Sequence, residues 1–290
     1  MRRLAAASVL AGLCLAAAPA HAGPWIPDPG HGYLKLWARW LAGFGYHAAD
    51  GSTIPYGAYH EVSLNAYAEV GVGAGFMVWA NSPFVSTFTL SDPRAGGETR
   101  AHVAFGDSTA GARYGIVRRG PFRFSVGAFV RAPIAPSGVR QDVYSTEGPP
   151  ARAPFGGLRI GNGAWDLGGE LSAGYGWSRV YTAASVAWVW RSDGFDPVLT
   201  YTAEAGASVT QRWSARLRVT GYHSIALGSA RRHNSPSGIG NGTRYVGFAL
   251  ETDYRVSGRS FVGLTFEGGV AAIERQTGGP VTSIYYALQF

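Results

Sequence analysis

The sequence predicts an all-β fold: a transmembrane, antiparallel, up-and-down β-barrel of about twelve strands with both termini in the periplasm. Three features of the 290-residue chain lead to this prediction. Apolar and polar residues alternate in about a dozen stretches, the connections between them are short and long in turn, and the chain ends on a strand-like segment with a C-terminal Phe. A secretory signal peptide at the other end supplies the means of export.

Residues 1–22 have the parts of a secretory signal peptide. A basic start with Arg2 and Arg3 is followed by an apolar run and by an Ala-His-Ala cleavage site at positions 20–22. We therefore expect export, cleavage at this site, and a single transmembrane barrel domain over residues 23–290 in the outer membrane of a Gram-negative bacterium.

Composition restricts the class of protein. Beyond the signal peptide, no apolar run approaches the roughly 18 residues that a spanning helix needs, so a helical membrane protein is excluded. The 42 glycines and the 13% of aromatic residues suit strands with one apolar and one polar face. Removal of Arg2 and Arg3 lowers the formal charge from +7 to +5, and the other basic residues are scattered, so nucleic acid is not an expected partner. The only cysteine, Cys14, lies in the signal peptide, so no disulfide is expected.

Each alternating stretch has roughly the 9–11 residues that a tilted strand needs to cross a bilayer. The clearest stretch is 59–70, where Leu64 would face lipid and Asn65 the lumen. Strands are expected near residues 31–41, 59–70, 76–85, 104–117, 121–133, 163–177, 180–191, 198–210, 213–223, 243–256, 260–272 and 282–290.

The connections decide between a barrel and a secreted β-sandwich of similar composition. Short links follow the second, fourth, sixth, eighth and tenth strands, whereas long links follow the first, third, fifth and ninth. The loops at 192–197 and 274–280 are shorter but keep this parity. Outer-membrane barrels have tight periplasmic turns and longer extracellular loops, so the parity places both termini in the periplasm. The longest loop, residues 134–160, is rich in Pro and Gly and is the expected lid or constriction.

The C-terminal segment shows the alternation that a membrane wall requires. Ile284, Tyr286, Leu288 and Phe290 share one face of the last strand. A terminal Phe on the apolar face resembles the signal by which barrel-assembly machinery recognises its substrates. The expected partners are therefore this machinery, membrane lipid, lipopolysaccharide and a small-molecule solute, and the expected state is a monomer.

Charged residues fall almost entirely on the faces that would point into the lumen. Both signs are nearly balanced, and they could pair across a narrow lumen because an unpaired charge beside a low-dielectric wall is costly. Two interpretations stay open: ion pairs that fill the barrel, or a permeation path in which a few of these residues form a selectivity ring. The lumen-lining candidates are Lys35, Arg39, Glu61, Asn65, Glu69, Asp107, Arg113, Arg123, Arg131, Asp166, Glu170, Glu204, Arg216, Arg218, Glu251, Asp253 and Glu267.

A lipid-hydrolysing barrel enzyme that uses Ser and His is the main rival hypothesis. The nearest constellation is His223 and Ser224 with His233 and Asn234 in the following loop. Adjacent residues on a strand point to opposite faces, and no carboxylate in that loop would orient a histidine, so no catalytic residue is predicted. The other histidines are isolated in the sequence, and neither a metal nor another cofactor is expected.

Several segments resemble the outer-membrane transporters associated with the meta-pathway of phenol degradation. Residues 29–36 look like their first strand, and residues 64–71 look like their second strand and turn. Phe105-Gly106-Asp107 with Gly111-Ala112-Arg113-Tyr114 resembles their G-D-x-x-x-G-x-R-Y strand. Residues 130–133 are similar to their K-x-P strand end, and residues 161–167 to their G-x-G-x-x-D entry.

The resemblance covers most of the mature chain and implies a barrel for passive uptake of small, often hydrophobic or aromatic, molecules. Arg131-Ala132 stands here for the family's usual Lys before Pro, and Asn65 occupies a position that is often acidic. The distantly similar fatty-acid and hydrophobic-compound transporters carry a longer N-terminal plug. Only residues 23–30 precede the first strand here, so no dedicated plug is expected.

Overall fold

The computed structural model describes residues 23–47, 52–91, 99–136, 161, 163–225, 241–274 and 276–290. The predicted signal peptide and most of the loop at 134–160 lie outside these residues, as do His233 and Asn234. Within the described part of the chain, no helix is long and apolar enough to cross a membrane.

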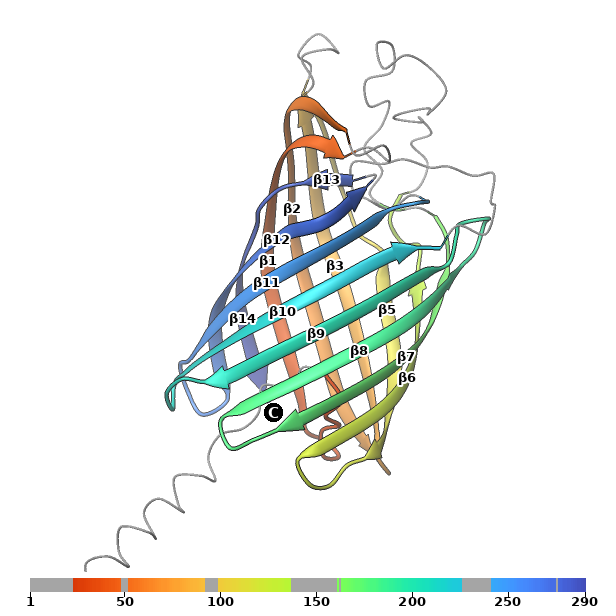
Figure 1. The fold of residues 1–290 in the computed structure, drawn as a ribbon. Coiled ribbons are helices and arrows are strands. Elements are labelled where there is room, and N and C mark those ends of the chain that lie inside the picture. The colour runs from red at the N-terminus through yellow and green to blue at the C-terminus, as the bar shows by residue number, and fades with distance from the viewer. Residues whose placement is uncertain are drawn as a thin grey trace, which may run out of the picture.

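The strands form one antiparallel sheet that closes into a barrel, as Figure 1 shows, which confirms the predicted all-β, twelve-stranded fold. Among the residues described, fourteen strand segments make twelve positions in the wall, because two positions each hold two segments. β4 and β5 occupy one position, on either side of a break at residues 105–107, and β13 and β14 occupy another. The strands are β1 (Gly32–His47), β2 (Thr53–Gly73), β3 (Phe76–Ser91), β4 (Thr99–Ala104), β5 (Ser108–Val117), β6 (Phe122–Ala132), β7 (Asp166–Gly176), β8 (Val180–Arg191), β9 (Val198–Ser208), β10 (Trp213–Ser224), β11 (Arg244–Arg255), β12 (Ser260–Glu274), β13 (Gln276–Gly278) and β14 (Val281–Gln289).

The first and last strands close the wall. β1 pairs with β2 on one edge and with β14 on the other, and Gly32 and Phe290 exchange N–H···O hydrogen bonds of 2.9 and 3.1 Å. Closure matters because an unpaired strand edge cannot be satisfied in hydrocarbon.

The two ends of the barrel differ. We name the end that holds Gly32, Phe290 and the tight turns the turn end, and the opposite end the loop end (Figure 1). The turns lie at residues 74–75, 118–121, 177–179, 209–212 and 256–259.

The first three strands are longer than the sequence predicts. β2 begins at Thr53 rather than near residue 59, because residues 53–55 pair with residues 45–47 of β1 although Pro55 interrupts the alternation. β3 continues to Ser91, and the wall rises higher on this side of the barrel (Figure 1).

The predicted strand 104–117 is broken near its start. At the break, the Gly106 N–H donates to the Pro83 carbonyl oxygen at 2.7 Å. The part of β3 before Pro83 pairs with β5, and the part after Pro83 pairs with β4. Pro83 has no N–H to donate, and the register of β2 against β3 shifts at Pro83 as well. The remaining strand bounds agree with prediction to within a few residues.

The wall has an apolar outer face. Leu64 is 42% exposed on the outside of β2, whereas Asn65 beside it is 7% exposed on the inside. Ile284 and Tyr285 alternate in the same way on β14. Exposed aromatic side chains mark both rims, as interfacial girdles do. They are Phe76, Tyr114, Phe122, Tyr175, Trp177, Trp213, Tyr286 and Phe290 at the turn end, and Trp40, Trp165, Trp188 and Trp190 at the loop end.

Candidate solute path in the lumen

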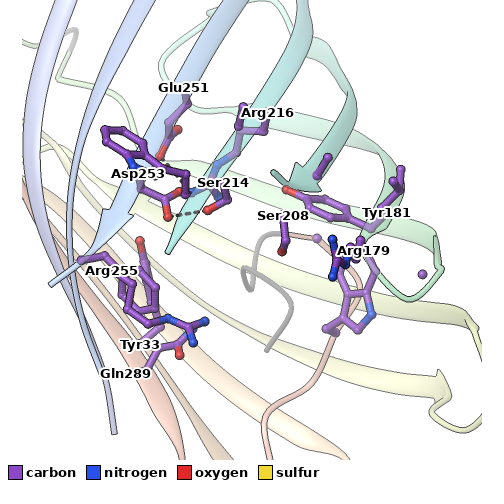
Figure 2. Close-up of a pocket in the computed structure, with 18 of the residues that line it drawn as sticks. Tyr33, Arg179, Tyr181, Ser208, Ser214, Arg216, Glu251, Asp253, Arg255 and Gln289 are labelled. Carbon is purple, nitrogen blue, oxygen red and sulfur yellow. Dashed lines mark hydrogen bonds and ion pairs between the residues drawn. The ribbon is translucent and has the colours of Figure 1, made fainter. Parts of the chain in front are cut away.

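A cavity of about 590 Å³ occupies the part of the lumen next to the turn end. Figure 2 shows Arg179, Tyr181 and Ser208 on one side of it, and Tyr33 and Arg255 on the other. Its volume lies within the roughly 300–1,000 Å³ of small-molecule sites. The wall strands and the turns at residues 177–179 and 209–212 contribute to its lining.

An ion-pair network forms one wall of the cavity. Glu251, which is buried on β11, accepts from Lys35 at 2.8 Å and from Arg218 at 3.1 Å, and lies 3.3 Å from Arg216. Arg216 also pairs with Asp253 at 2.8 Å, and Arg218 with Glu204 at 3.1 Å. The three basic and three acidic side chains balance in charge, as buried ions must to offset desolvation.

Tyrosines complete this network. The Tyr181 hydroxyl donates to Glu204 at 2.5 Å, and the Lys35 ammonium lies 3.8 Å from the ring centroid of Tyr285. Both rings lie over a cross-strand glycine, since a Cβ on Gly206 or Gly263 would come within 2.3 Å of them. Bare backbone at these two positions lets the rings lie flat against the wall and leaves the cavity open.

A second cluster lies across the lumen on β5 and β7. Arg113 pairs with Glu170 at 2.7 Å, and Glu170 also accepts from the Ser172 hydroxyl at 2.6 Å. Arg113 donates to the Gly23 carbonyl oxygen at 2.7 Å as well. The cluster therefore connects the wall to the segment that precedes β1.

That N-terminal segment enters the barrel, contrary to the expectation that no plug is present. Pro24 is fully buried, and the Trp25 ring contacts the Tyr181 ring edge-on at 5.4 Å between centroids. Gly174 lies under both residues, where a Cβ would approach them to 2.8 and 2.9 Å. Eight extended residues reach about 26 Å, which suffices to cross a narrow barrel, so length alone was a poor criterion.

The remaining candidates divide among smaller groups. Near the loop end, Arg131 and Arg191 both pair with Asp166, and the Asp107 carboxylate accepts from the Ala135 N–H at 3.0 Å. These groups are separate from the turn-end cavity. Other placements are the Arg39–Glu61 pair at 2.7 Å, Asn65 donating to Ser63 at 3.0 Å, Glu69 accepting from Tyr67, Arg123 donating to the Gly120 carbonyl, and Glu267 opposite Val281.

Three arginines that line the cavity were not predicted from the sequence. Arg179, Arg212 and Arg255 line the cavity but were not among the candidates. Arg255 has the same strand parity as Asp253 on β11, so alternation could have found it. Arg179 and Arg212 lie in turns, where alternation gives no direction.

The candidate hydrolase pair has other partners. The Ser224 hydroxyl is buried and accepts from the Gly242 N–H at 3.0 Å, and the His223 Nε2 lies 3.4 Å from the Tyr201 hydroxyl. His223 and Ser224 thus lie on opposite faces of β10 and are not arranged as base and nucleophile. Among the residues that the structure describes, no group of three or more His, Cys, Asp or Glu could hold a metal ion.

A closed antiparallel wall, an apolar belt between aromatic girdles and a polar, ion-paired interior define a β-barrel of the bacterial outer-membrane type. Neither a protein-family model nor a curated protein matches the sequence.

Three solved structures of outer-membrane channels and porins have a similar fold. An outer-membrane channel from Pseudomonas putida F1 has a TM-score of 0.67 at 10% identity, over 94% of this chain and 100% of that chain. The NanC porin has a TM-score of 0.52 at 10% identity, over 89% and 100% of the two chains. The KdgM porin in complex with disordered oligogalacturonate has a TM-score of 0.50 at 6% identity, over 89% and 99%. At these identities the likeness establishes a shared fold.

Proposed function

We propose that the protein is a monomeric outer-membrane channel that admits small solutes by passive diffusion, with its turn end in the periplasm. The observation that carries this proposal is the cavity of about 590 Å³ within the barrel wall. A barrel built only as a scaffold would gain from a packed interior, because filled space stabilises a core. The cavity is instead kept open where the aromatic rings lie flat over glycines.

Small hydrophobic or aromatic solutes are the class that the lining favours. Trp25, Tyr33, Trp37, Tyr67 and Tyr181 present ring surfaces to the cavity. Aromatic rings prefer offset or edge-to-face contact with one another, so a ring-bearing solute gains from this lining beyond area burial. The resemblance to transporters of the phenol-degradation type supports the same class.

The lumen-lining candidates take two roles in this proposal. Lys35, Arg216, Arg218, Glu251 and Asp253 both line the cavity and hold one another in place, so they set its polarity without being free to bind solute. The groups around Asp107 and Asp166 lie nearer the loop end, so a solute that enters from that end would pass them before it reaches the cavity.

Solute flux through reconstituted protein tests the proposal. In Ser208→Trp a bulky ring would fill the cavity, because Ser208 lines it from β9. We expect arabinose to enter liposomes that hold the wild-type protein, and this variant to reduce that flux. Ala203→Trp is the matched control, since Ala203 is exposed on the lipid face of the same strand.

A structural barrel with a blocked lumen is the second candidate. The N-terminal segment in the turn-end opening favours it, because Gly23, Pro24 and Trp25 are held by Arg113, Gly174 and Tyr181. Under this alternative, liposomes with the wild-type protein are no more permeable than protein-free liposomes, and Trp25→Ala opens a path. If neither protein passes solute, the channel proposal is wrong.

A further inference from the structure

The turn-end mouth of the cavity carries positive charge that its neighbours leave unneutralised. The arginine mouth, as we name it, comprises Arg123, Arg179 and Arg255, all of which line the cavity. The acidic residues of the same lining are Glu251 and Asp253, and both are already paired with Arg216. Among the described residues, no carboxylate pairs with the arginine mouth.

The hydrogen bonds and ring contacts of these arginines are to neutral groups. Arg123 donates to the Phe122 carbonyl oxygen at 3.1 Å. Arg212 is not part of the mouth, because it donates to the Tyr254 hydroxyl at 3.1 Å on the outer face of the barrel. The Arg255 guanidinium lies 5.4 Å from the Phe261 ring centroid, and its Nε is buried without a hydrogen-bond partner. A buried donor without an acceptor is costly, so an incoming acceptor that satisfies it is favoured.

Two of these arginines lie on opposite sides of the cavity, each near a tyrosine. In Figure 2, Arg179 lies beside Tyr181 and Ser208, whereas Arg255 lies beside Tyr33 and Gln289 on the other side of the cavity. A guanidinium presents a planar fork that matches a carboxylate with two parallel hydrogen bonds. The neighbouring rings offer a surface to the apolar part of the same molecule.

We infer that the arginine mouth makes this cavity a site for small aromatic molecules with one negative charge, of the benzoate type, and makes the path anion-selective. The inference rests on the proposed function and names its substrate class. The carboxylate binds at either Arg179 or Arg255, which lie on opposite sides of the cavity, and the ring lies among the aromatic side chains. Cations are disfavoured, because the carboxylates deeper in the cavity are already paired with Lys35, Arg216 and Arg218.

Binding is tested first, on the purified barrel in detergent, by saturation-transfer NMR titration. Benzoate, benzyl alcohol and benzylamine share one ring and differ in charge. We expect the wild-type protein to bind benzoate at least about tenfold more tightly than either analogue, which is the scale of a charge-assisted hydrogen bond. The double variant Arg179→Gln with Arg255→Gln should lose this preference and keep its affinity for benzyl alcohol.

Arg119→Gln with Arg259→Gln is the matched control. Both residues are exposed in turns of the same end but do not line the cavity, so the double control removes equal charge. It should keep the benzoate preference. Heat-modifiability on gels shows whether each variant is a folded barrel.

Ion selectivity is tested next, by reversal potentials across planar bilayers with a KCl gradient. We expect the wild type to favour chloride over potassium, and Arg179→Gln with Arg255→Gln to lower that ratio several-fold, whereas the control double variant does not. Equal affinity for the three ring compounds, or a benzoate preference that survives in the cavity variant, overturns the inference. The channel proposal still stands in that case if the protein passes solute. If the barrel binds benzoate but passes no solute, the channel proposal is wrong and the binding site stands.

Discussion

At the scale of single residues, the environment changes with every step along a strand. Leu64 faces lipid and Asn65 faces the crowded lumen, although they are neighbours in β2. The same substitution therefore has unlike effects at adjacent positions, and substitutions test the register directly.

Leu64→Arg should destabilise the barrel by about 2–4 kcal/mol, because a charged side chain would replace an apolar one on the lipid face of the wall. Leu64→Met keeps the apolar character and should cost less than about 1.5 kcal/mol. Denaturant unfolding titrations in phospholipid vesicles measure both. If the arginine variant were as stable as the methionine variant, the assignment of this face to lipid would be wrong.

Gly206→Ala tests the packing of rings on bare backbone. An added Cβ would lie 2.3 Å from the Tyr181 ring, so the ring must move and the Tyr181–Glu204 hydrogen bond is strained or lost. We expect a loss of about 1–3 kcal/mol, typical of overpacking. Gly169→Ala on β7 is the control, since nothing lies within 4 Å of its added Cβ. Similar unfolding free energies for the two variants would contradict the account.

At the scale of elements, the last strand both closes the barrel wall and carries the proposed signal for assembly. β14 lies between β12 and β1, and Phe290 exchanges hydrogen bonds with Gly32 at the start of β1. The terminal ring is exposed on the outer face, where a membrane partner could contact it.

Deletion of Phe290 should lower the amount of assembled, heat-modifiable barrel far more than the amount of exported polypeptide. The reason is the proposed recognition of the C-terminal strand by the barrel-assembly machinery, together with the loss of two backbone hydrogen bonds. Cell fractionation with gel-shift analysis separates the two quantities. Phe290→Tyr keeps the aromatic ring and should assemble normally, and normal assembly of the deletion would remove the argument for this partner.

At the scale of the whole molecule, the two ends of the barrel are chemically distinct. The turn end carries the arginine mouth and the cavity, and the loop end carries the taller wall of β1–β3. The orientation of the barrel in the membrane decides which compartment the arginine mouth faces.

Single cysteines can report that orientation, because the chain after the predicted signal peptide has none. Ser257→Cys places a thiol in an exposed turn, and Ser52→Cys places one at the loop end between β1 and β2. We expect a membrane-impermeant maleimide to label Ser52→Cys in intact cells, and Ser257→Cys only after the outer membrane is permeabilised. The opposite pattern would invert the proposed topology.

The sequence alone determined what depends on period and parity. Alternation predicted the antiparallel strands, most of their bounds and the two faces of β2 and β14, because side chains on a strand alternate with a period of two whatever their neighbours. The parity of short and long connections favoured an outer-membrane barrel over a β-sandwich, because such barrels have tight turns at one end and longer loops at the other.

Only the tertiary structure decided what lies opposite what. The pairing of Lys35 on β1 with Glu251 on β11, three wall positions away, depends on barrel size and stagger, which no local pattern encodes. The same holds for Trp25, which contacts Tyr181 only because the segment before β1 turns into the lumen. Arg179 reaches the mouth from a turn whose geometry the alternating pattern does not describe. Contacts between residues distant in the chain are set by closure of the wall, and closure is a property of the whole sheet.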